Sequence, residues 1–371
     1  MKTAALALIA VSAIHALTSA TLIVDEAPQD VRPYVLPKNH GLAVVIGAQV
    51  YRFSVTGNSS GGAFTLLQTN APESTTLGVN PHIHKTHYEN FYCTRGRFQL
   101  WAQPYDYEAE QQTRVLTQGD YGAVPHDTYH TYQILDPDTQ MTGVIQPGGF
   151  EKLFIDIADS SYNSSTLASF IPSAVNSSGG AGTDAAFLAA LQAYDVYAQP
   201  DWQLRYDTIN GTGGSGNWHN GSNELATDEV TPYFVAKNYA QKYLNYENGY
   251  KLIAPLQTGV QSAGNFTLGT VTLSAKLANE TANTIVPKQP LAFQLEEGQL
   301  VVEVEDETAS LIEGDVLFVP AGTTFSYYAT VPVTKFFYVS GGANGFDYDL
   351  LQNSTEWDFA SYPSYAGYES A

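Results

Sequence analysis

The segment His82-Ile83-His84-Lys85-Thr86-His87-Tyr88-Glu89 contains three of the chain's eight histidines, and it decides how the sequence is interpreted. Successive side chains of a strand point to opposite faces, so His82 and His84 point to one side and can bind one ion. Glu89 follows five residues after His84, and His130 supplies another imidazole downstream. Three imidazoles and a carboxylate suit a redox-capable divalent metal such as copper, iron, manganese or nickel. We therefore predict a metal site formed by His82, His84, Glu89 and His130.

Two further histidines lie in the same part of the chain. His87 falls inside the quoted segment, but strand alternation does not require it to share the face of the ligands. His126 falls in the turn that precedes His130. We expect both side chains to be solvated or to support the ligands without binding the ion.

The N-terminus predicts secretion. Lys2, a short apolar run over residues 4–13 and small residues at 18–20 are typical of a signal peptide that is cleaved near Ala20, and we assign residues 1–20 to it. No later segment approaches the length of a transmembrane helix. Eight Asn-x-Ser/Thr sequons are typical of a secreted glycoprotein. They predict glycans on Asn58, Asn163, Asn176, Asn210, Asn220, Asn265, Asn279 and Asn353.

The composition limits the partners of the chain. It has 37 acidic and 16 basic residues, and its formal net charge at pH 7 is −21. Such a charge argues against a nucleic acid or an anionic membrane surface as partner. The single cysteine, Cys93, excludes an intrachain disulfide, so the folded state depends on its hydrophobic core. We expect Cys93 itself to be a small buried side chain.

The sequence repeats itself. Pro33-Tyr34-Val35-Leu36-Pro37-Lys38-Asn39 returns as Pro232-Tyr233-Phe234-Val235-Ala236-Lys237-Asn238, and Gly119-Asp120-Tyr121-Gly122-Ala123-Val124-Pro125 returns as Gly314-Asp315-Val316-Leu317-Phe318-Val319-Pro320. Short strand-like segments between Gly and Pro turns, such as 98–102 and 300–304, indicate sandwiches or small barrels. We therefore predict an all-β chain with duplicated domains over 21–159 and 224–371.

Residues 160–223, between the two copies, have a different character. They are rich in Ser, Gly, Asn and Ala, and they contain four of the eight sequons. One stretch, 184–197, has Phe187, Leu188, Leu191 and Tyr194 at near-helical spacing. We predict a long glycosylated linker with one short helix. A segment that is ordered into a lid, or packed across the domains, is the open alternative.

The motifs resemble those of a known superfamily. Gly78, His82-x-His84, Glu89 and Gly96 resemble the first cupin motif, with two fewer residues than usual between the glycine and His82. Gly119-x5-Pro125-x-Asp127-x2-His130 resembles the second motif, with Asp127 where glycine is usual. The resemblance covers both repeats and implies two jelly-roll β-barrels in tandem. A secreted glycoprotein of this kind, with a metal site only in its first barrel, resembles the fungal quercetin 2,3-dioxygenases.

The second repeat has the glycine and proline positions of the motifs but lacks their metal-binding side chains. Alignment of the repeats through their shared motifs places Thr284, Val286, Leu291 and Phe325 at the four ligand positions. None of these side chains could hold a catalytic metal there. We therefore expect one metal ion per chain, in the N-terminal domain.

The resemblance implies copper as the metal, with a flavonol and O2 as substrates. It implies that Glu89 is both a ligand and the general base that accepts the proton of the flavonol 3-hydroxyl. The reaction of that family cleaves the heterocyclic ring and releases carbon monoxide and a depside. Manganese, iron or nickel, and a homodimeric state, stay open. The positions that match the family's flavonoid pocket are Tyr51, Thr69, Phe91, Tyr132, Met141, Ile145 and Phe150, with Tyr132 where phenylalanine is typical.

Two alternatives stay open, a different cupin enzyme and a non-enzymatic protein. A manganese-dependent oxalate oxidase or decarboxylase needs a cationic pocket for a small dianion, and the cations near the motif are Lys85, Arg95 and Arg97. A non-enzymatic storage or binding bicupin commonly lacks ligands in both barrels. The apolar pocket residues and the complete ligand set favour the dioxygenase interpretation.

Overall fold

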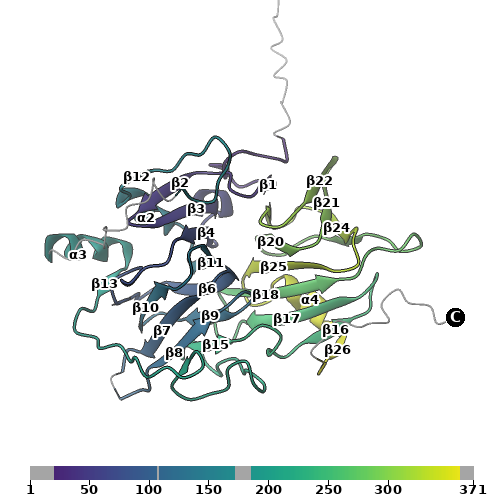
Figure 1. Cartoon of the computed structure of the whole chain (residues 1–371). Coiled ribbons are helices and arrows are strands. Elements are labelled where there is room, and N and C mark those ends of the chain that lie inside the picture. Colours follow the sequence, from purple (N-terminus) through teal and green to yellow (C-terminus); the bar gives the residue numbers. More distant parts are fainter. Residues whose placement is uncertain (1–20, 107, 172–184, 360–371) are drawn as a thin grey trace, which may run out of the picture.

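A computed structural model describes residues 21–106, 108–171 and 185–359. The assigned signal peptide, residues 1–20, and the sequon at Asn176 lie outside these ranges. The described chain forms two β-barrels side by side, the N-terminal barrel in purple to teal and the C-terminal barrel in green to yellow (Figure 1). The prediction of an all-β chain with two barrels in tandem is confirmed.

The N-terminal barrel consists of two antiparallel sheets with the strand orders β12-β2-β3-β4-β11-β6-β9-β15 and β13-β5-β10-β7-β8-β14. Its own strands are β2 (Ala43–Ile46), β3 (Gln49–Val55), β4 (Thr65–Ala71), β5 (His82–Ile83), β6 (Tyr88–Arg95), β7 (Phe98–Pro104), β8 (Gln112–Leu116), β9 (Tyr121–Val124), β10 (Thr128–Ile134) and β11 (Thr139–Gln146). Two short helices accompany them, α1 (Gly57–Ser60) and α2 (Glu151–Asp156).

The C-terminal barrel has the strand orders β1-β23-β20-β25-β18-β17-β16-β26 and β19-β24-β21-β22. Its own strands are β16 (Tyr243–Asn245), β17 (Lys251–Gln257), β18 (Phe266–Leu273), β19 (Asn283–Ile285), β20 (Leu291–Glu297), β21 (Leu300–Val304), β22 (Glu307–Leu311), β23 (Val316–Val319), β24 (Phe325–Ala329), β25 (Thr334–Gly341) and β26 (Ser354–Glu356). The helix α4 (Phe346–Gln352) precedes the last of these strands.

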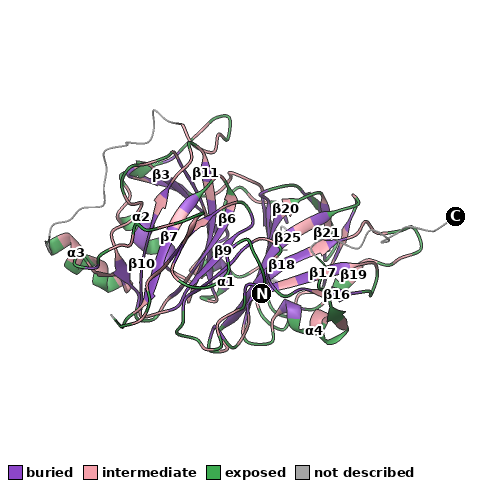
Figure 2. Ribbon diagram, turned by 60° about the horizontal axis from the view of Figure 1, so that its bottom comes forward, coloured by how far each residue is buried: buried purple, intermediate pink, exposed green. Residues whose placement is uncertain are grey.

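Alternation of side chains explains the strands and the cores. In β21, Leu300, Val302 and Val304 are buried, whereas Val301 and Glu303 are half-buried, as expected for a strand with one face on a core. Strands of both barrels are mainly buried (Figure 2). Apolar clusters fill both barrels, and another lies between the barrels, where Tyr34, Tyr121 and Phe318 belong to a common core.

The barrels exchange their first repeat strands. β1 (Tyr34–Leu36), from the N-terminal repeat, pairs with β23 of the C-terminal barrel. β15 (Tyr233–Val235), from the C-terminal repeat, pairs with β9 of the N-terminal barrel, and these two strands are labelled side by side in Figure 1. Each exchanged strand therefore completes an edge of the other barrel, and the extended backbone of that edge gains hydrogen-bond partners.

The loops after the exchanged strands make matching contacts. The backbone N–H of Lys38 donates to Oδ1 of Asp315 at 2.8 Å, and the N–H of Lys237 donates to Oδ1 of Asp120 at the same distance. Asp120 and Asp315 are buried equivalents in the two repeats. The duplication in the sequence is thus a pseudo-symmetric interface in the structure.

The described part of the segment between the barrels packs against the N-terminal barrel. It contains β12 (Ser160–Ser161), α3 (Ala185–Leu191), the 3-10 helix η2 (Gln192–Tyr194), β13 (Tyr197–Ala198) and β14 (Thr212–Gly213). β12 extends one sheet of the barrel, and β13 and β14 form the two edges of the other sheet. Of the two interpretations of this segment, the ordered one is observed for residues 160–171 and 185–223. Within the described ranges, every helix is too short or too polar to cross a membrane.

Candidate active site

Four side chains meet inside the N-terminal barrel. His82 begins β5, His84 lies just after that strand, Glu89 is in β6 and His130 is in β10. One potential ligand atom from each residue lies within 4.8 Å of the others. The three histidines are buried, and the side chain of Glu89 is 14% exposed. The structure therefore brings together the four residues that the sequence pattern predicts, and their role as metal ligands stays a prediction.

The main chain orients all three imidazoles in the same way. Each ring donates its Nδ1–H to a backbone carbonyl at 2.8 or 2.9 Å. The acceptors are the carbonyl groups of Asn80 for His82, Asp195 for His84 and Thr128 for His130. Because Nδ1 carries the proton, Nε2 of each neutral ring has a free lone pair.

The donor set fits a divalent metal ion. Nε2 of His84 and Nε2 of His130 lie 3.2 and 3.0 Å from Oε2 of Glu89. With Nδ1 protonated, these contacts bring lone pairs to face lone pairs, which is favourable only when a cation or a proton lies between them. Metal bonds of about 2.0–2.2 Å place neighbouring ligand atoms about 3–3.5 Å apart. The same four residues would hold the ion through three nitrogens and a carboxylate.

Burial and mutual contact shift the protonation of these groups. Burial lowers the pKa of His82 well below its usual value, and the neighbouring His130 and His84 lower it further. Burial raises the pKa of Glu89, but a proton or cation shared with His130 and His84 favours the ionised carboxylate, outweighs burial and lowers the pKa overall. A neutral imidazole and an ionised carboxylate are the forms that bind a metal.

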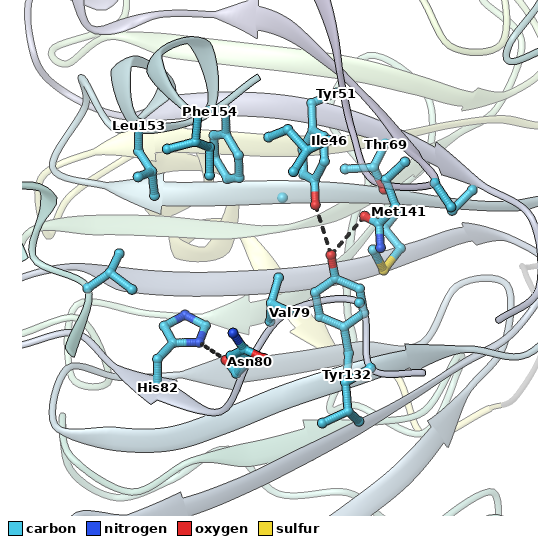
Figure 3. Close-up of a pocket in the computed structure, with 18 of the residues that line it drawn as sticks. Ile46, Tyr51, Thr69, Val79, Asn80, His82, Tyr132, Met141, Leu153 and Phe154 are labelled. Atoms are coloured by element: carbon cyan, nitrogen blue, oxygen red, sulfur yellow. Dashed lines mark hydrogen bonds between the residues drawn. The ribbon is translucent and has the colours of Figure 1, made fainter. Parts of the chain in front are cut away.

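An apolar cavity opens beside the four residues. Its volume is about 130 Å³, whereas one water needs about 10–15 Å³, so it has room for a polyatomic ligand. His82 and Glu89 are part of its wall. The rest of the wall includes side chains from β3, β4, β6, β10, β11 and α2 (Figure 3).

Six of the seven residues assigned to the flavonoid pocket line this cavity. They are Tyr51, Thr69, Phe91, Tyr132, Met141 and Phe150. Ile145 is absent from the wall and packs in the buried cluster that contains Phe53 and Leu67. It is the register partner of Glu89 in the neighbouring strand, so it supports the ligand strand β6.

The wall has a second polar region besides the ligands. The hydroxyl groups of Tyr51 and Tyr132 lie 3.1 Å apart, and Tyr132 donates to the side-chain oxygen of Gln49 at 2.8 Å (Figure 3). Burial raises the pKa of Tyr132 to about 12, so the hydroxyl stays protonated. A Cβ atom on Gly78 would lie 2.3 Å from the Tyr132 ring, so the motif glycine allows the ring to occupy this position. The hydroxyl of Thr69, also in the wall, is buried without a hydrogen-bond partner.

Part of the cavity wall comes from the segment between the barrels, which the sequence analysis did not assign to the site. Phe187, Leu188 and Leu191 of α3 face the cavity, as do Val196 and Ala198. Tyr194, which shares their helical spacing, instead donates to a carboxylate oxygen of Asp156 in α2. The signal in the sequence that could have assigned this helix to the cavity wall is its apolar face, with side chains at positions i, i+1 and i+4.

Asp195 and Asn80 were also missed. Both offer backbone carbonyls to ligand histidines, and Asp195 additionally accepts hydrogen bonds from the loop that follows His84. Because any residue type provides a backbone carbonyl, the sequence contained no signal for this role.

Neither of the two remaining histidines of the region belongs to the four-residue group. Nδ1 of His87 lies 2.8 Å from a carboxylate oxygen of Asp195, and burial lowers the pKa of this ring. Nδ1 of His126 lies 3.1 Å from a carboxylate oxygen of Asp127, in the turn between β9 and β10. Cys93 is buried, as expected, and burial raises the pKa of its thiol.

The three cations near the motif do not line the cavity. Lys85 lies over the ring of Tyr197, 4.2 Å from its centroid. Arg95 and Arg97 form exposed ion pairs with Asp138 and Asp136. A small dianion in this cavity would have no arginine or lysine partner among the described wall residues.

In the second barrel, the structure corrects the alignment of the repeats by one residue at the first ligand position. His82 is the register partner of His130, and the partner of Phe325 in the C-terminal barrel is Ile285. Ile285, rather than Thr284, therefore corresponds to His82. The loop before this strand differs in length between the repeats, and motif spacing alone does not fix such a shift.

The same shift applies at the second position. The N–H of Asp127 donates to the carbonyl of His84, and the N–H of Gly322 donates to the carbonyl of Pro287 in the equivalent turn. Pro287, rather than Val286, therefore corresponds to His84. Like Leu291 and Phe325, it has no metal-binding group. Among the described residues, the N-terminal group is the only cluster of at least three potential ligands.

Fold and site together define a tandem cupin with a metal-binding group in one barrel, and the sequence comparison specifies the family. The chain is 46% identical to the quercetin 2,3-dioxygenase of Aspergillus japonicus over 350 residues, which cover 93% of this chain and 99% of that protein. This chain belongs to the quercetin 2,3-dioxygenase family and is an oxidoreductase. It is also 31% identical to the quercetin 2,3-dioxygenase of Bacillus subtilis strain 168 over 134 residues, 36% of this chain and 37% of that protein. No family model matches the chain.

Similarities to solved structures are weaker. The oxalate decarboxylase of Lactobacillus farciminis has a TM-score of 0.49 at 13% identity, covering 85% of each chain. The salicylate 1,2-dioxygenase of Pseudaminobacter salicylatoxidans has a TM-score of 0.48 at 12% identity, covering 79% of this chain and 74% of that chain.

Proposed function

We propose that this protein is a secreted copper enzyme that opens the heterocyclic ring of flavonols such as quercetin with O2 and releases carbon monoxide and a depside. The observation that carries this proposal is the position of the four-residue group at the wall of an apolar, aromatic cavity. Membership of the quercetin 2,3-dioxygenase family supports the substrate class.

His82, His84, Glu89 and His130 would hold the metal. When bound there, a copper ion supplies a Lewis acid that coordinates the flavonol 3-oxygen and a redox partner for the reaction with O2. Three neutral imidazoles and one carboxylate leave coordination room for a substrate atom. The donor set supports copper without excluding manganese, iron or nickel, so metal identity is part of the proposal.

Glu89 acts on the proton of the substrate. Its lowered pKa keeps the carboxylate ionised at neutral pH, and its side chain reaches the cavity surface. The ionised carboxylate is the form that can accept the proton of the flavonol 3-hydroxyl, and that hydroxyl would be acidified by a cation bound at the site, which offsets the low pKa of Glu89. A flavonolate results, and the proton stays on a carboxylate oxygen of Glu89.

The aromatic wall orients the flat substrate and excludes water. Phe91 and Phe150 border the cavity near the ligands, where the Phe150 ring lies 5.2 Å from the His84 ring between centroids. Aromatic side chains stack on or pack edge-on against planar rings. The hydroxyl groups of Tyr51, Tyr132 and Thr69 offer polar partners to substituents on the substrate.

Secretion and glycosylation belong to the same proposal. The seven sequon asparagines in the described ranges are all exposed, as glycosylation requires. Mass spectrometry of the protein recovered from the culture medium should give a mature start close to Thr21 and a mass above that of the polypeptide. An intact Met1 and an unmodified mass would contradict this part of the proposal.

One experiment tests the catalytic proposal. Purified protein, analysed for bound metal, is supplied with quercetin, and O2 consumption and carbon monoxide release are measured together. Oxalate serves as the alternative substrate, because a dianion would distinguish the manganese oxidase or decarboxylase interpretation. Equal molar O2 uptake and carbon monoxide release with quercetin support the proposal. Metallated protein that is inactive on every flavonol overturns it and favours a binding bicupin.

A further inference from the structure

A single residue of the segment between the barrels holds the loop of the metal-binding motif. The carboxylate of Asp195 accepts hydrogen bonds from the backbone N–H groups of Lys85, Thr86 and His87 at 3.0, 2.9 and 3.0 Å. One of its oxygens also lies 2.8 Å from Nδ1 of His87. Three consecutive N–H groups that converge on one carboxylate fix the path of the chain between His84 and Glu89.

The main chain of Asp195 contacts a ligand directly. Its carbonyl oxygen accepts the Nδ1–H of His84 at 2.8 Å. Such a hydrogen bond selects the tautomer with a free Nε2 and fixes the rotation of the ring. The same residue therefore orients the ligand through its carbonyl group and supports the following loop through its carboxylate.

Asp195 also connects this loop to the cavity wall. It ends η2 in the left-handed conformation, with φ of 62°, and lies between α3 and β13. α3 provides Phe187, Leu188 and Leu191 to the wall, and β13 pairs with the ligand strand, with Ala198 as the register partner of His82. The contacts to the motif and to the wall are thus made by adjacent parts of one short segment.

We propose that Asp195 is a positioning residue that couples the α3–β13 wall of the cavity to the geometry of the metal ligands. The inference rests on the proposed function only in taking the four-residue group as a metal site. Coupling between two sites is reciprocal. Metal binding therefore should stabilise the wall segment, and loss of the Asp195 carboxylate should weaken metal binding.

The test compares parent, Asp195→Asn and Asp195→Ala, with Asp201→Asn as control because Asp201 is exposed in the same segment. Asparagine tolerates the left-handed conformation but offers one acceptor oxygen in place of two. Cu2+ affinity of the metal-free protein is measured by competition with a chelator. The Cu2+ paramagnetic resonance spectrum reports ligand geometry. Amide hydrogen exchange of residues 186–198, with and without Cu2+, reports the wall, and none of these measurements needs a flavonol.

Both substitutions leave the carbonyl contact to His84 and change only the carboxylate that holds the loop, so we expect Asp195→Asn to bind Cu2+ about tenfold more weakly, at the low end of the effect for direct partners of metal ligands, with Asp195→Ala weaker still. The spectrum should change, and Cu2+ should slow exchange of residues 186–198 in the parent and the control but not in the Asp195 variants. A folded Asp195→Asn protein with parental affinity, spectrum and metal-dependent protection would overturn the proposal.

If both Asp195 substitutions prevent folding, a further variant tests the proposal. His87→Ala removes one contact of the Asp195 carboxylate and leaves the three backbone contacts. It should weaken Cu2+ binding about fivefold, and unchanged affinity would count against the role of Asp195. A parent that binds Cu2+ but does not consume O2 with quercetin refutes the catalytic proposal alone, because the Asp195 measurements are made without substrate.

Discussion

Glu89 and His130 belong to different sheets of the N-terminal barrel, yet Oε2 of Glu89 lies 3.0 Å from Nε2 of His130. The candidate metal site therefore bridges the two sheets across the barrel interior. The geometry of the site therefore depends on the packing of the two sheets against each other as well as on the conformation of each ligand strand.

Replacement of Glu89 by Gln tests the base role. The amide keeps a weak oxygen ligand but cannot accept the proton of the 3-hydroxyl, so turnover should fall about a hundredfold or more. Carbon monoxide release with quercetin, divided by bound metal, is the measurement. Glu73→Gln is the matched control because Glu73 is exposed. A fully metallated Glu89→Gln protein as fast as the parent would show that another group is the base.

Metal stoichiometry tests the difference between the barrels. Only one cluster of ligands is found among the described residues, so elemental analysis should give about one ion per chain, and His130→Ala should lower this occupancy directly. Phe325→Ala, at the equivalent position of the C-terminal barrel, should leave the metal content unchanged while it lowers stability. Two specifically bound ions per chain would refute the one-site prediction.

Substitution of Tyr132, in the polar region of the cavity wall, should lower stability measurably but change activity little. Tyr132→Phe keeps the ring but leaves the buried side-chain oxygen of Gln49 without its donor, so the free energy of unfolding should fall by about 1–3 kcal/mol. Activity on quercetin should stay within a few-fold of the parent, because ring shape is preserved. Denaturant unfolding and steady-state kinetics together check this. A large loss of turnover with unchanged stability would show instead that the hydroxyl contacts the reacting part of the substrate.

Lys251 predicts a pH dependence of stability. Burial lowers its pKa from 10.5 to about 8. Between these values the unfolded chain binds more protons than the folded chain, so this group makes the free energy of unfolding rise with pH, by at most about 1.4 kcal/mol per pH unit. The stability of the parent relative to Lys251→Met should therefore increase from pH 8 to pH 10. Lys288→Met, at an exposed position, should show no such trend. If the difference in the free energy of unfolding between the parent and Lys251→Met does not change with pH, the lowered pKa of Lys251 is contradicted.

The two exchanged strands offer a matched pair of substitutions. Asp315 accepts from Lys38 N–H and from Ile312 N–H, whereas Asp120 additionally receives the hydroxyl of Thr117 and contacts His219. We expect Asp120→Asn to lower the free energy of unfolding by about 2–4 kcal/mol and Asp315→Asn by less, since hydrogen bonds to a charged acceptor contribute about 1.5–3 kcal/mol. Thermal unfolding of both variants measures this, and an equal loss would show that the extra contacts contribute nothing.

The sequence predicted the four-residue group because strand alternation and a motif resemblance together point to it. Strand alternation places His82 and His84 together, whereas Glu89 and His130, which lie in different sheets, were assigned through the spacing of the two cupin motifs. The same reasoning did not find Asp195, since its contacts to the motif span about 110 residues and involve a main-chain carbonyl. Long-range backbone contacts leave no pattern in side-chain types.

The barrel order was predictable, whereas the strand exchange was not. The repeats around Tyr34 and Tyr233 showed that an equivalent element exists in each copy. Their apolar pattern is satisfied equally by either barrel, so it does not indicate which sheet each strand joins. The one-residue correction at Ile285 has the same origin, because pairing register is set by partners that are distant in the sequence.

The exchange of β1 and β15 has a consequence for synthesis of the chain. β9 in the N-terminal barrel keeps an open edge until β15 leaves the ribosome, more than a hundred residues later. At about 5–20 residues per second, this interval lasts on the order of ten seconds. β1 waits longer still, for β23. The emerging chain thus carries unpaired strand edges during translation, and the two halves must finish folding together rather than in the order in which they are made.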